Sequence, residues 1–159
     1  MDRHPLLALA GALLVSAALA GPALAAGTTT TTTTYESGVA GEAYNEGMTA
    51  ANAGDWDLAI TKFTIATTED PESADAFNML AYSYRNNGDY DQAFRYYDKA
   101  LELDPNHADA YEYLGEAYLA VDNVAKAEAQ LAALDVICGS DCEQKDELMQ
   151  AIADYKDSH

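Results

Sequence analysis

The sequence predicts an all-α fold: a right-handed α-solenoid of three helical hairpins followed by a C-terminal capping helix. The chain repeats itself every 34 residues, so that Gly88 and Asp104 fall on Gly54 and Asp70 when shifted. Each repeat holds two segments in which apolar residues recur at helical spacing, and a short turn with glycine or aspartate separates them. A fixed period of this length is typical of stacked units that cannot bury their apolar faces alone.

Residues 1–25 are predicted to be a cleaved secretory signal peptide. Arg3 supplies a positive charge, Leu6–Ala20 is an uncharged apolar run, and Ala23-Leu24-Ala25 fits the cleavage pattern, with the cut expected after Ala25. The alternative is an uncleaved anchor, although the run is short for a transmembrane helix, which needs about 20 apolar residues. We therefore expect a periplasmic or secreted protein of bacterial type, with no membrane insertion after cleavage.

Residues 26–39 are predicted to form a flexible linker. Seven consecutive threonines, Thr28–Thr34, offer no apolar face to bury. The threonines could carry O-linked sugars, but a role as a spacer requires nothing further.

The charge of the chain excludes two classes of partner. The sequence has 8 Lys and Arg against 27 Asp and Glu. Cleavage after Ala25 would remove one residue of each sign, so the net charge would stay at −19. A surface this acidic repels nucleic acid and anionic lipid. We expect the charge to lie on solvated helical surfaces.

The predicted solenoid domain spans residues 40–156. Its three repeats are residues 40–73, 74–107 and 108–141. In the middle repeat, Gly88 suits the left-handed conformation that ends a helix, and Asp89 suits an N-cap. Asp104-Pro105 ends the second helix, because the residue before a proline avoids the helical region. Each repeat is therefore predicted to be a helical hairpin.

The middle repeat closely resembles the tetratricopeptide repeat. That family prefers a leucine, small residues, a turn glycine, aromatic residues and a late proline at fixed positions. The chain supplies them as Phe77, Leu80, Ala81, Tyr84, Gly88, Tyr90, Ala93, Tyr97, Ala100 and Pro105. The resemblance implies a right-handed stack of hairpins whose small residues let the helices approach closely.

The outer parts of the domain depart from this pattern. The third repeat has Asp122 in place of the turn glycine and lacks the late proline. Terminal repeats are often atypical because one of their faces meets solvent. Leu148, Ile152 and Tyr155 then share one stripe, which predicts a capping helix over residues 141–156.

Cys138 and Cys142 are predicted to form a disulfide. An exported protein meets an oxidising compartment, where an even pair of nearby cysteines favours a disulfide. One alternative is a redox site with Cys142 at the start of the last helix. Another is a metal site, which needs two or more further ligands, whereas His107 and His159 are the only histidines after the signal peptide.

No catalytic constellation is present in the sequence. It holds no phosphate-binding loop, no G-x-S-x-G and no H-E-x-x-H. We expect no catalytic, cofactor-binding or metal-binding residues. A cell-envelope enzyme that uses a surface pair of acids stays open as an alternative.

The family resemblance implies a concave groove lined by the first helix of each hairpin. The groove positions correspond to Tyr44, Met48, Asn52, Asp75, Asn78, Tyr82, Arg85, Asp109, Glu112 and Glu116. Some family members clamp a peptide carboxylate with several basic and amide side chains, but here Arg85 is the only base at these positions. We therefore expect no capture of acidic C-terminal peptides. The alternatives are a basic or amphipathic peptide, bound by the acids and by apolar anchors, or acids that only solvate the groove.

These inferences lead to one leading function and two alternatives. The leading function is an exported scaffold that binds envelope proteins or peptides. The first alternative is a thiol redox or metal-handling protein that uses Cys138 and Cys142, and the second is the envelope enzyme.

Overall fold

The computed structural model describes residues 39–139 and 142–159. The chain divides into two units, Met1–Thr32 and Thr33–His159, and all described residues belong to the second unit. The predicted signal peptide, residues 1–25, lies outside the described residues. So does the predicted linker, except that its last residue, Val39, already begins the first helix.

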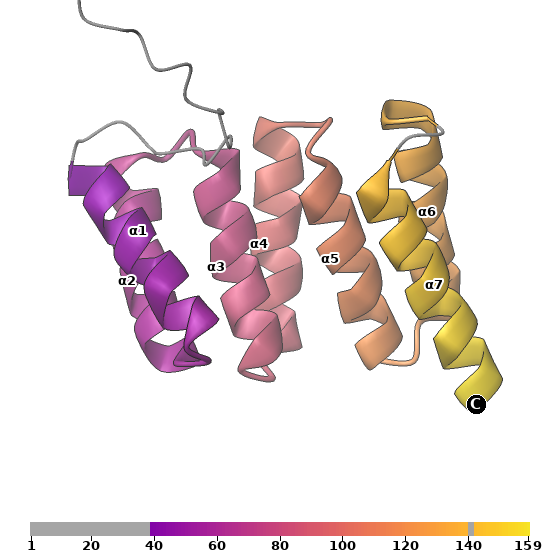
Figure 1. The fold of residues 1–159 in the computed structure, drawn as a ribbon. Helices are drawn as coiled ribbons and strands as arrows, with labels where there is room; N and C mark the ends of the chain where they lie inside the picture. The colour runs from indigo at the N-terminus through magenta and orange to yellow at the C-terminus, as the bar shows by residue number, and fades with distance from the viewer. Residues whose placement is uncertain (1–38, 140–141) are drawn as a thin grey trace, which may run out of the picture. The chain divides into compact units, whose positions relative to one another are not determined.

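The described residues form seven helices and no strands, which confirms the predicted all-α class. The helices pair as three hairpins in two layers, with α1, α3, α5 and α7 in one layer and α2, α4 and α6 in the other (Figure 1). Their bounds are α1 Val39–Asn52, α2 Trp56–Glu69, α3 Ala74–Asn86, α4 Tyr90–Leu103, α5 Ala108–Ala120, α6 Val124–Ile137 and α7 Glu143–Ser158. Within the described ranges, no helix is both long enough and apolar enough to cross a membrane.

Local sequence signals set the helix ends. The side chain of Asp89 accepts a hydrogen bond from the backbone N–H of Gln92, and Asp55 accepts one from Leu58 in the first hairpin. Gly88 has a φ of +85°, which glycine adopts without the steric cost of a side chain. The prediction that Asp104 would end its helix is confirmed, because α4 stops at Leu103 and Asp104 is its C-cap.

Small residues bring the helices together. A Cβ atom added to Gly47 on α1 would lie 2.8 Å from the ring of Phe63, and one added to Gly115 on α5 would lie 2.6 Å from Leu148 on α7. Both large side chains are fully buried. Backbone and side chain are therefore packed directly against each other, as the predicted role of the small residues requires.

Helix α7 begins two residues later and ends two residues later than the predicted capping helix. Leu148 and Ile152 are buried as predicted, while Tyr155 is only partly buried. The helix packs against α5 as well as α6. It therefore belongs to the same layer as α1, α3 and α5, rather than only covering the end of the third hairpin (Figure 1).

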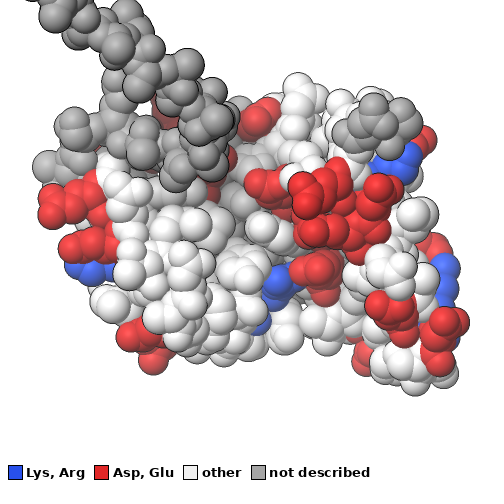
Figure 2. Space-filling model, viewed as in Figure 1, with Lys and Arg blue, Asp and Glu red and all other residues white. Residues whose placement is uncertain are grey.

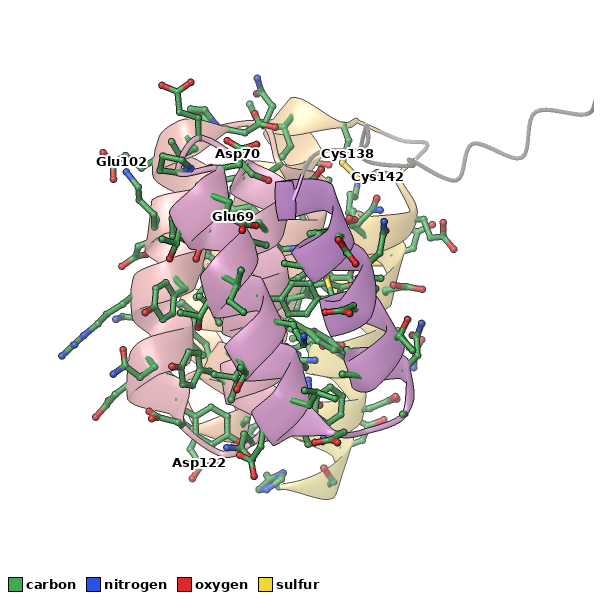
Figure 3. All side chains as sticks on the ribbon, turned by 90° about the vertical axis from the view of Figure 1, so that its left-hand side faces the viewer. Glu69, Asp70, Glu102, Asp122, Cys138 and Cys142 are labelled. Carbon is green, nitrogen blue, oxygen red and sulfur yellow. A yellow bond between two sulfur atoms is a disulfide. The ribbon has the colours of Figure 1, made fainter. Side chains whose placement is uncertain are left out.

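Polar contacts fasten α7 to the third hairpin. The ammonium of Lys145 lies 2.6 Å from a carboxylate oxygen of Asp135, and that of Lys156 lies 2.6 Å from Glu128. The hydroxyl of Tyr155 donates to Asp122 at 2.6 Å. At the other end, the Cα atoms of Cys138 and Cys142 lie 5.5 Å apart and their sulfur atoms are joined (Figure 3). That separation is within the usual range for a disulfide.

Candidate functional site

The α1 end of the predicted groove is aromatic and uncharged. Tyr44 packs edge-on against Phe63, with 5.5 Å between the ring centroids. Met48 is partly buried beside the same core cluster, and Asn52 is exposed at the end of the helix. These three predicted residues therefore offer apolar surface and one amide.

Arg85, the only base among the predicted groove positions, is already engaged. Its guanidinium lies 5.0 Å from the centroid of the Tyr82 ring and 5.6 Å from that of Tyr113. It also forms an ion pair with Glu116 of α5. Cation–π contacts and a charge-assisted hydrogen bond thus hold the guanidinium against α3 and α5. The carboxylate of Glu116 offsets part of the positive charge that a clamp for another carboxylate would use.

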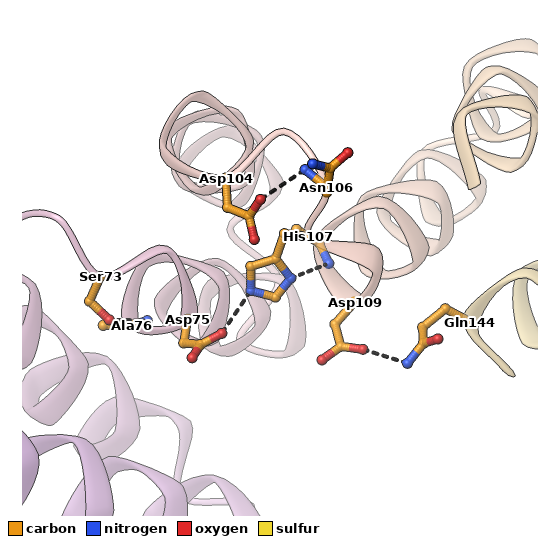
Figure 4. Close-up of polar contacts among 9 residues, drawn as sticks. Ser73, Asp75, Ala76, Asp104, Asn106, His107, Asp109 and Gln144 are labelled. Carbon is orange, nitrogen blue, oxygen red and sulfur yellow. Dashed lines mark hydrogen bonds and ion pairs between the residues drawn. The ribbon is translucent and has the colours of Figure 1, made fainter. Parts of the chain in front are cut away.

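Asp75, predicted as an open acid of the groove, is also paired. Its carboxylate lies 3.0 Å from Nε2 of His107, whose Nδ1 accepts the backbone N–H of Ala110 and so caps α5 (Figure 4). The hydrogen bond from His107 lowers the pKa of Asp75. Burial acts to lower the pKa of His107, but Asp75 outweighs it and the net shift is upward. The contact joins the first and last turns of the middle repeat and so ties α3 to the residue that caps α5.

Asp109 faces α7. The side-chain amide of Gln144 donates to its carboxylate at 2.7 Å (Figure 4). This predicted groove acid therefore connects α5 to the last helix.

Glu112 is buried, although it was predicted as an open acid for a basic ligand. It is 4% exposed on α5 and shares a hydrogen bond with Glu147 of α7. Burial and the neighbouring carboxylates of Glu147, Glu116 and Asp109 raise the pKa of Glu112 to about 8. Burial and these neighbours therefore favour the protonated form of the Glu112 carboxyl, which can donate a hydrogen bond to a carboxylate oxygen of Glu147.

A second row of acids lies on α7, which the groove prediction did not include. Figure 2 shows acidic side chains gathered over α5 and α7, beside a largely uncharged area over α3. A hollow of about 890 Å³ follows this row, lined by Glu116, Cys142, Glu143, Asp146, Glu147, Gln150, Ala151 and Asp154.

The repeat period contains the signal that could have found this row. Extending the register by one more period makes Cys142 the first position of a fourth unit. The groove positions of that unit are then Glu143, Asp146, Gln150, Ala153 and Asp154, and all except Ala153 line the hollow. Helix α7 thus acts as the first helix of a fourth repeat.

Asn78, the remaining predicted groove residue, is 2% exposed. Its Oδ1 atom has no hydrogen-bond partner among the described residues. Asn78 and Glu112 occupy the same position of consecutive repeats, 34 residues apart. A buried acceptor without a donor is costly, so this position calls for a donor from elsewhere.

The described residues contain no group of three or more His, Cys, Asp or Glu side chains that could hold a metal ion. On α5, Asp109 accepts from Gln144 and Glu116 pairs with Arg85, while on α7 Asp154 accepts from Gln150. The chemistry that this surface offers is therefore the recognition of cationic groups.

Two family models match the chain. Both are described as tetratricopeptide repeat, and they cover residues 44–106 and 84–136. The chain belongs to the tetratricopeptide-repeat family. This assignment confirms the resemblance seen in the middle repeat and extends it over all three hairpins. No curated protein matches the chain.

Solved structures of tetratricopeptide-repeat domains share this fold. The TPR2B domain of yeast Sti1, in a pHsp70 complex, is similar with 27% identity and a TM-score of 0.69, over 76% of this chain and 98% of that one. The TPR2AB domain of yeast Sti1, in a pHSP90 complex, has 28% identity and a TM-score of 0.65, over 72% of this chain and 46% of that one. The first tetratricopeptide-repeat domain of Spaghetti (RPAP3), bound to the HSP90 peptide SRMEEVD, has 20% identity and a TM-score of 0.64. The match covers 74% of this chain and 93% of that one.

Proposed function

We propose that this tetratricopeptide-repeat chain is a non-enzymatic interaction module that binds a basic or amphipathic segment of another protein. One observation carries the proposal: in the layer of α1, α3, α5 and α7, acidic side chains gather over α5 and α7 beside a largely uncharged area over α3 (Figure 2). Tyr44, Met48 and Tyr82 offer apolar anchor points, while the α5–α7 end offers carboxylates. Such a surface complements a segment with apolar residues followed by Lys or Arg.

The same surface argues against an acidic partner. The structural relatives include a domain bound to the peptide SRMEEVD, which carries three acidic side chains. In this chain the base at the groove, Arg85, is paired with Glu116, and the α7 row adds negative charge. An acidic tail would meet repulsion at the α5–α7 end.

A peptide array tests the proposal. The probes are immobilised 12-residue peptides in three matched sets, basic–apolar, acidic–apolar and neutral–apolar. We expect retention of the basic–apolar set, with affinity falling as salt is raised. Preferential retention of the acidic set would contradict the proposal.

A matched pair of charge reversals localises the binding. Asp146→Lys with Asp154→Lys removes charge from the hollow and should weaken binding of basic peptides about tenfold or more. Glu69→Lys with Glu102→Lys makes the same change in net charge on α2 and α4 and should leave the affinity within about twofold. Equal losses from both pairs would show that net charge, and not the groove, attracts the peptide.

We further propose that the protein is exported and acts among envelope or secreted proteins. The support is the n-region, apolar run and cleavage pattern of residues 1–25, together with the close Cys138–Cys142 pair. Mass analysis of the protein from its native host should show an N-terminus at Ala26. An uncut N-terminus would contradict this part of the proposal.

The Cys138–Cys142 pair is proposed as a structural disulfide that stabilises the α6–α7 connection. By loop-closure entropy, a loop this short contributes about 2 kcal/mol. Thiol titration should find no free thiol without reductant and two with it. Two free thiols in native protein would favour the redox or metal alternative instead.

A further inference from the structure

The two sulfur atoms of the Cys138–Cys142 bond lie in different surroundings. Cys138 is partly exposed, and the carbonyl oxygen of Leu134 lies 3.2 Å from its sulfur on the α6 side. Cys142 is only 4% exposed and belongs to the same buried cluster as Leu148. Attack by a thiol on a disulfide depends on access to the sulfur that is attacked. A thiol from solvent therefore reaches Cys138 more easily than Cys142.

The charges around the two sulfur atoms also differ. Cys142 lies on the wall of the acidic hollow, among carboxylates of α7. On the other side of the bond, the ammonium of Lys145 donates to the carbonyl oxygen of Gly139, next to Cys138, at 3.2 Å and also pairs with Asp135. A thiol attacks as the negatively charged thiolate. It therefore meets repulsion at the Cys142 sulfur and a nearby cation at the Cys138 sulfur.

The helix ends favour Cys142 as the sulfur that leaves. Cys138 is the C-cap of α6, and Cys142 is the N-cap of α7. A helix carries partial negative charge at its C-terminal end and partial positive charge at its N-terminal end. A thiolate is stabilised by the second environment, and the sulfur with the lower thiol pKa leaves faster. Glu143 and Asp146 in the first turn of α7 act against this stabilisation, so access to Cys138 is the larger factor.

Release of Cys142 would also give α7 an acceptor at its N-cap. In each of α2 to α6, the N-cap side chain accepts a hydrogen bond from the backbone N–H of the residue three positions later. Cys142, whose sulfur is joined to Cys138, makes no such bond to the described residues. A free Cys142 thiolate has the lone pairs that this position uses.

We propose that the Cys138–Cys142 bond is a site of S-thiolation by a low-molecular-weight thiol, in which Cys138 is the sulfur attacked and Cys142 the sulfur released. The incoming thiolate forms a bond to the Cys138 sulfur, the bond between the two cysteines breaks, and its electron pair leaves on the Cys142 sulfur. One disulfide is exchanged for another, so no further oxidant or reductant is consumed. The inference rests on the proposed disulfide and adds which of its sulfur atoms reacts.

The test treats the full chain with excess glutathione at about pH 8, where part of a simple thiol is ionised. Samples are acidified at early times, and N-ethylmaleimide then marks the released thiol. Trypsin yields one peptide, Ala127–Lys145, that holds both cysteines, and tandem mass spectrometry locates the two labels. We expect glutathione on Cys138 and maleimide on Cys142, in at least about tenfold excess over the reverse arrangement. Equal amounts, the reverse preference or no mixed disulfide at all would overturn the proposal.

Two controls assign the preference to the fold. In concentrated urea the surroundings of the two sulfur atoms are lost, so the preference should fall to within about twofold. Lys145→Gln removes the cation near Cys138 and should slow attack there about twofold or more. Lys156→Gln makes the same change in net charge near the other end of α7 and should react as the wild type. A preference that persists in urea, or equal rates in the two variants, would overturn the proposal.

The thiol count of the untreated protein separates this inference from the disulfide on which it rests. If the protein has no free thiol and glutathione attacks Cys142, the structural disulfide stands and the S-thiolation site at Cys138 is wrong. Two free thiols before treatment would overturn both. The binding of basic–apolar peptides is measured by the array and depends on neither result.

Discussion

Single side chains of the predicted groove are mostly committed to contacts inside the protein. Asp75 and His107 are the clearest case, because their contact ties α3 to the N-cap of α5 and leaves the other ring nitrogen to cap that helix. Sequence position placed Asp75 on the groove but could not reveal this partner. The contact depends on how the α4–α5 turn folds back over α3.

The Asp75–His107 contact should make stability depend on pH. Because folding lowers the pKa of Asp75, this carboxylate stabilises the folded state at pH values above the pKa of an unfolded aspartate, about 3.9. Because folding raises the pKa of His107, this imidazole stabilises the folded state at pH values below the pKa of an unfolded histidine, about 6.5. Between these limits both contributions are present. The histidine part is lost as the pH rises through the folded pKa of His107, and the aspartate part as it falls through that of Asp75.

We predict that Asp75→Asn lowers the free energy of unfolding by about 1 kcal/mol at pH 5.5 and by clearly less at pH 8.5, since Asp75 is exposed and partly screened. Urea denaturation at the two pH values measures this, and NMR titration should show a lower pKa for His107. Asp91→Asn, at an exposed acid of α4, is the control. Equal losses at both pH values would contradict the prediction.

Helix α7 is the element whose role changed most between sequence and structure. The apolar stripe predicted a helix that covers the open end of the third repeat, and Leu148 and Ile152 do so. The same helix also lines the acidic hollow, and Gly115 lets Leu148 approach α5 closely. The extended repeat register could have predicted the acid row, whereas the Glu112–Glu147 contact required knowledge of how closely the two helices pack.

Gly115→Ala should separate α5 from α7. The added Cβ would lie 2.6 Å from the Leu148 methyl groups, so this buried side chain must change its position or the helices must shift. We predict a loss of about 1–2 kcal/mol in unfolding free energy, which is the cost of overpacking less the helix preference of alanine. A double-mutant cycle with Leu148→Ala, measured by urea denaturation, tests whether contact with Leu148 causes this loss. In the Leu148→Ala protein, Gly115→Ala should no longer lower the free energy of unfolding. An equal loss in both backgrounds would point to a different mechanism.

The Glu112–Glu147 contact should destabilise the α5–α7 interface at high pH. The folded pKa of Glu112, about 8, exceeds its unfolded value, so the folded state binds more protons between the two. Stability therefore falls as the pH rises through this window. We predict that the wild type loses about 1–2 kcal/mol more than Glu112→Gln between pH 6 and pH 9. Parallel denaturation profiles for the two proteins would contradict this, and Glu128→Gln is the control.

The molecule as a whole carries a large negative charge. Several of its few bases are tied to single acids, as in the Lys62–Glu46 and Lys99–Glu102 pairs. Exposed pairs of this kind contribute little to stability, while the net charge of −19 repels itself throughout the folded chain. We predict that the melting temperature rises by several degrees between about 0.02 M and 0.3 M NaCl. Differential scanning calorimetry measures the melting temperature, and choline chloride is the control, because it screens charge as NaCl does but does not supply sodium ions. A melting temperature that falls with NaCl would contradict the prediction.

The hairpin architecture could be predicted from sequence because its signals are local. Gly88 and Asp89 determine a turn and a cap within four residues, and the 34-residue period repeats the arrangement. The state of the groove could not be predicted in the same way. The pKa of Glu112 depends first on burial that only the packed structure provides, and then on Glu147, which lies 35 residues away on another helix.

Asp122 takes the place that glycine holds in the first two turns and keeps the left-handed backbone, with a φ of 59°. Its carboxylate accepts the Tyr155 hydroxyl, so the turn of the third repeat also secures the last helix. A protein engineer who restored the consensus glycine here would relieve backbone strain but would release the lower end of α7. In this repeat array, departure from consensus at one turn therefore fixes the position of the last helix, and a substitution toward consensus would remove that contact.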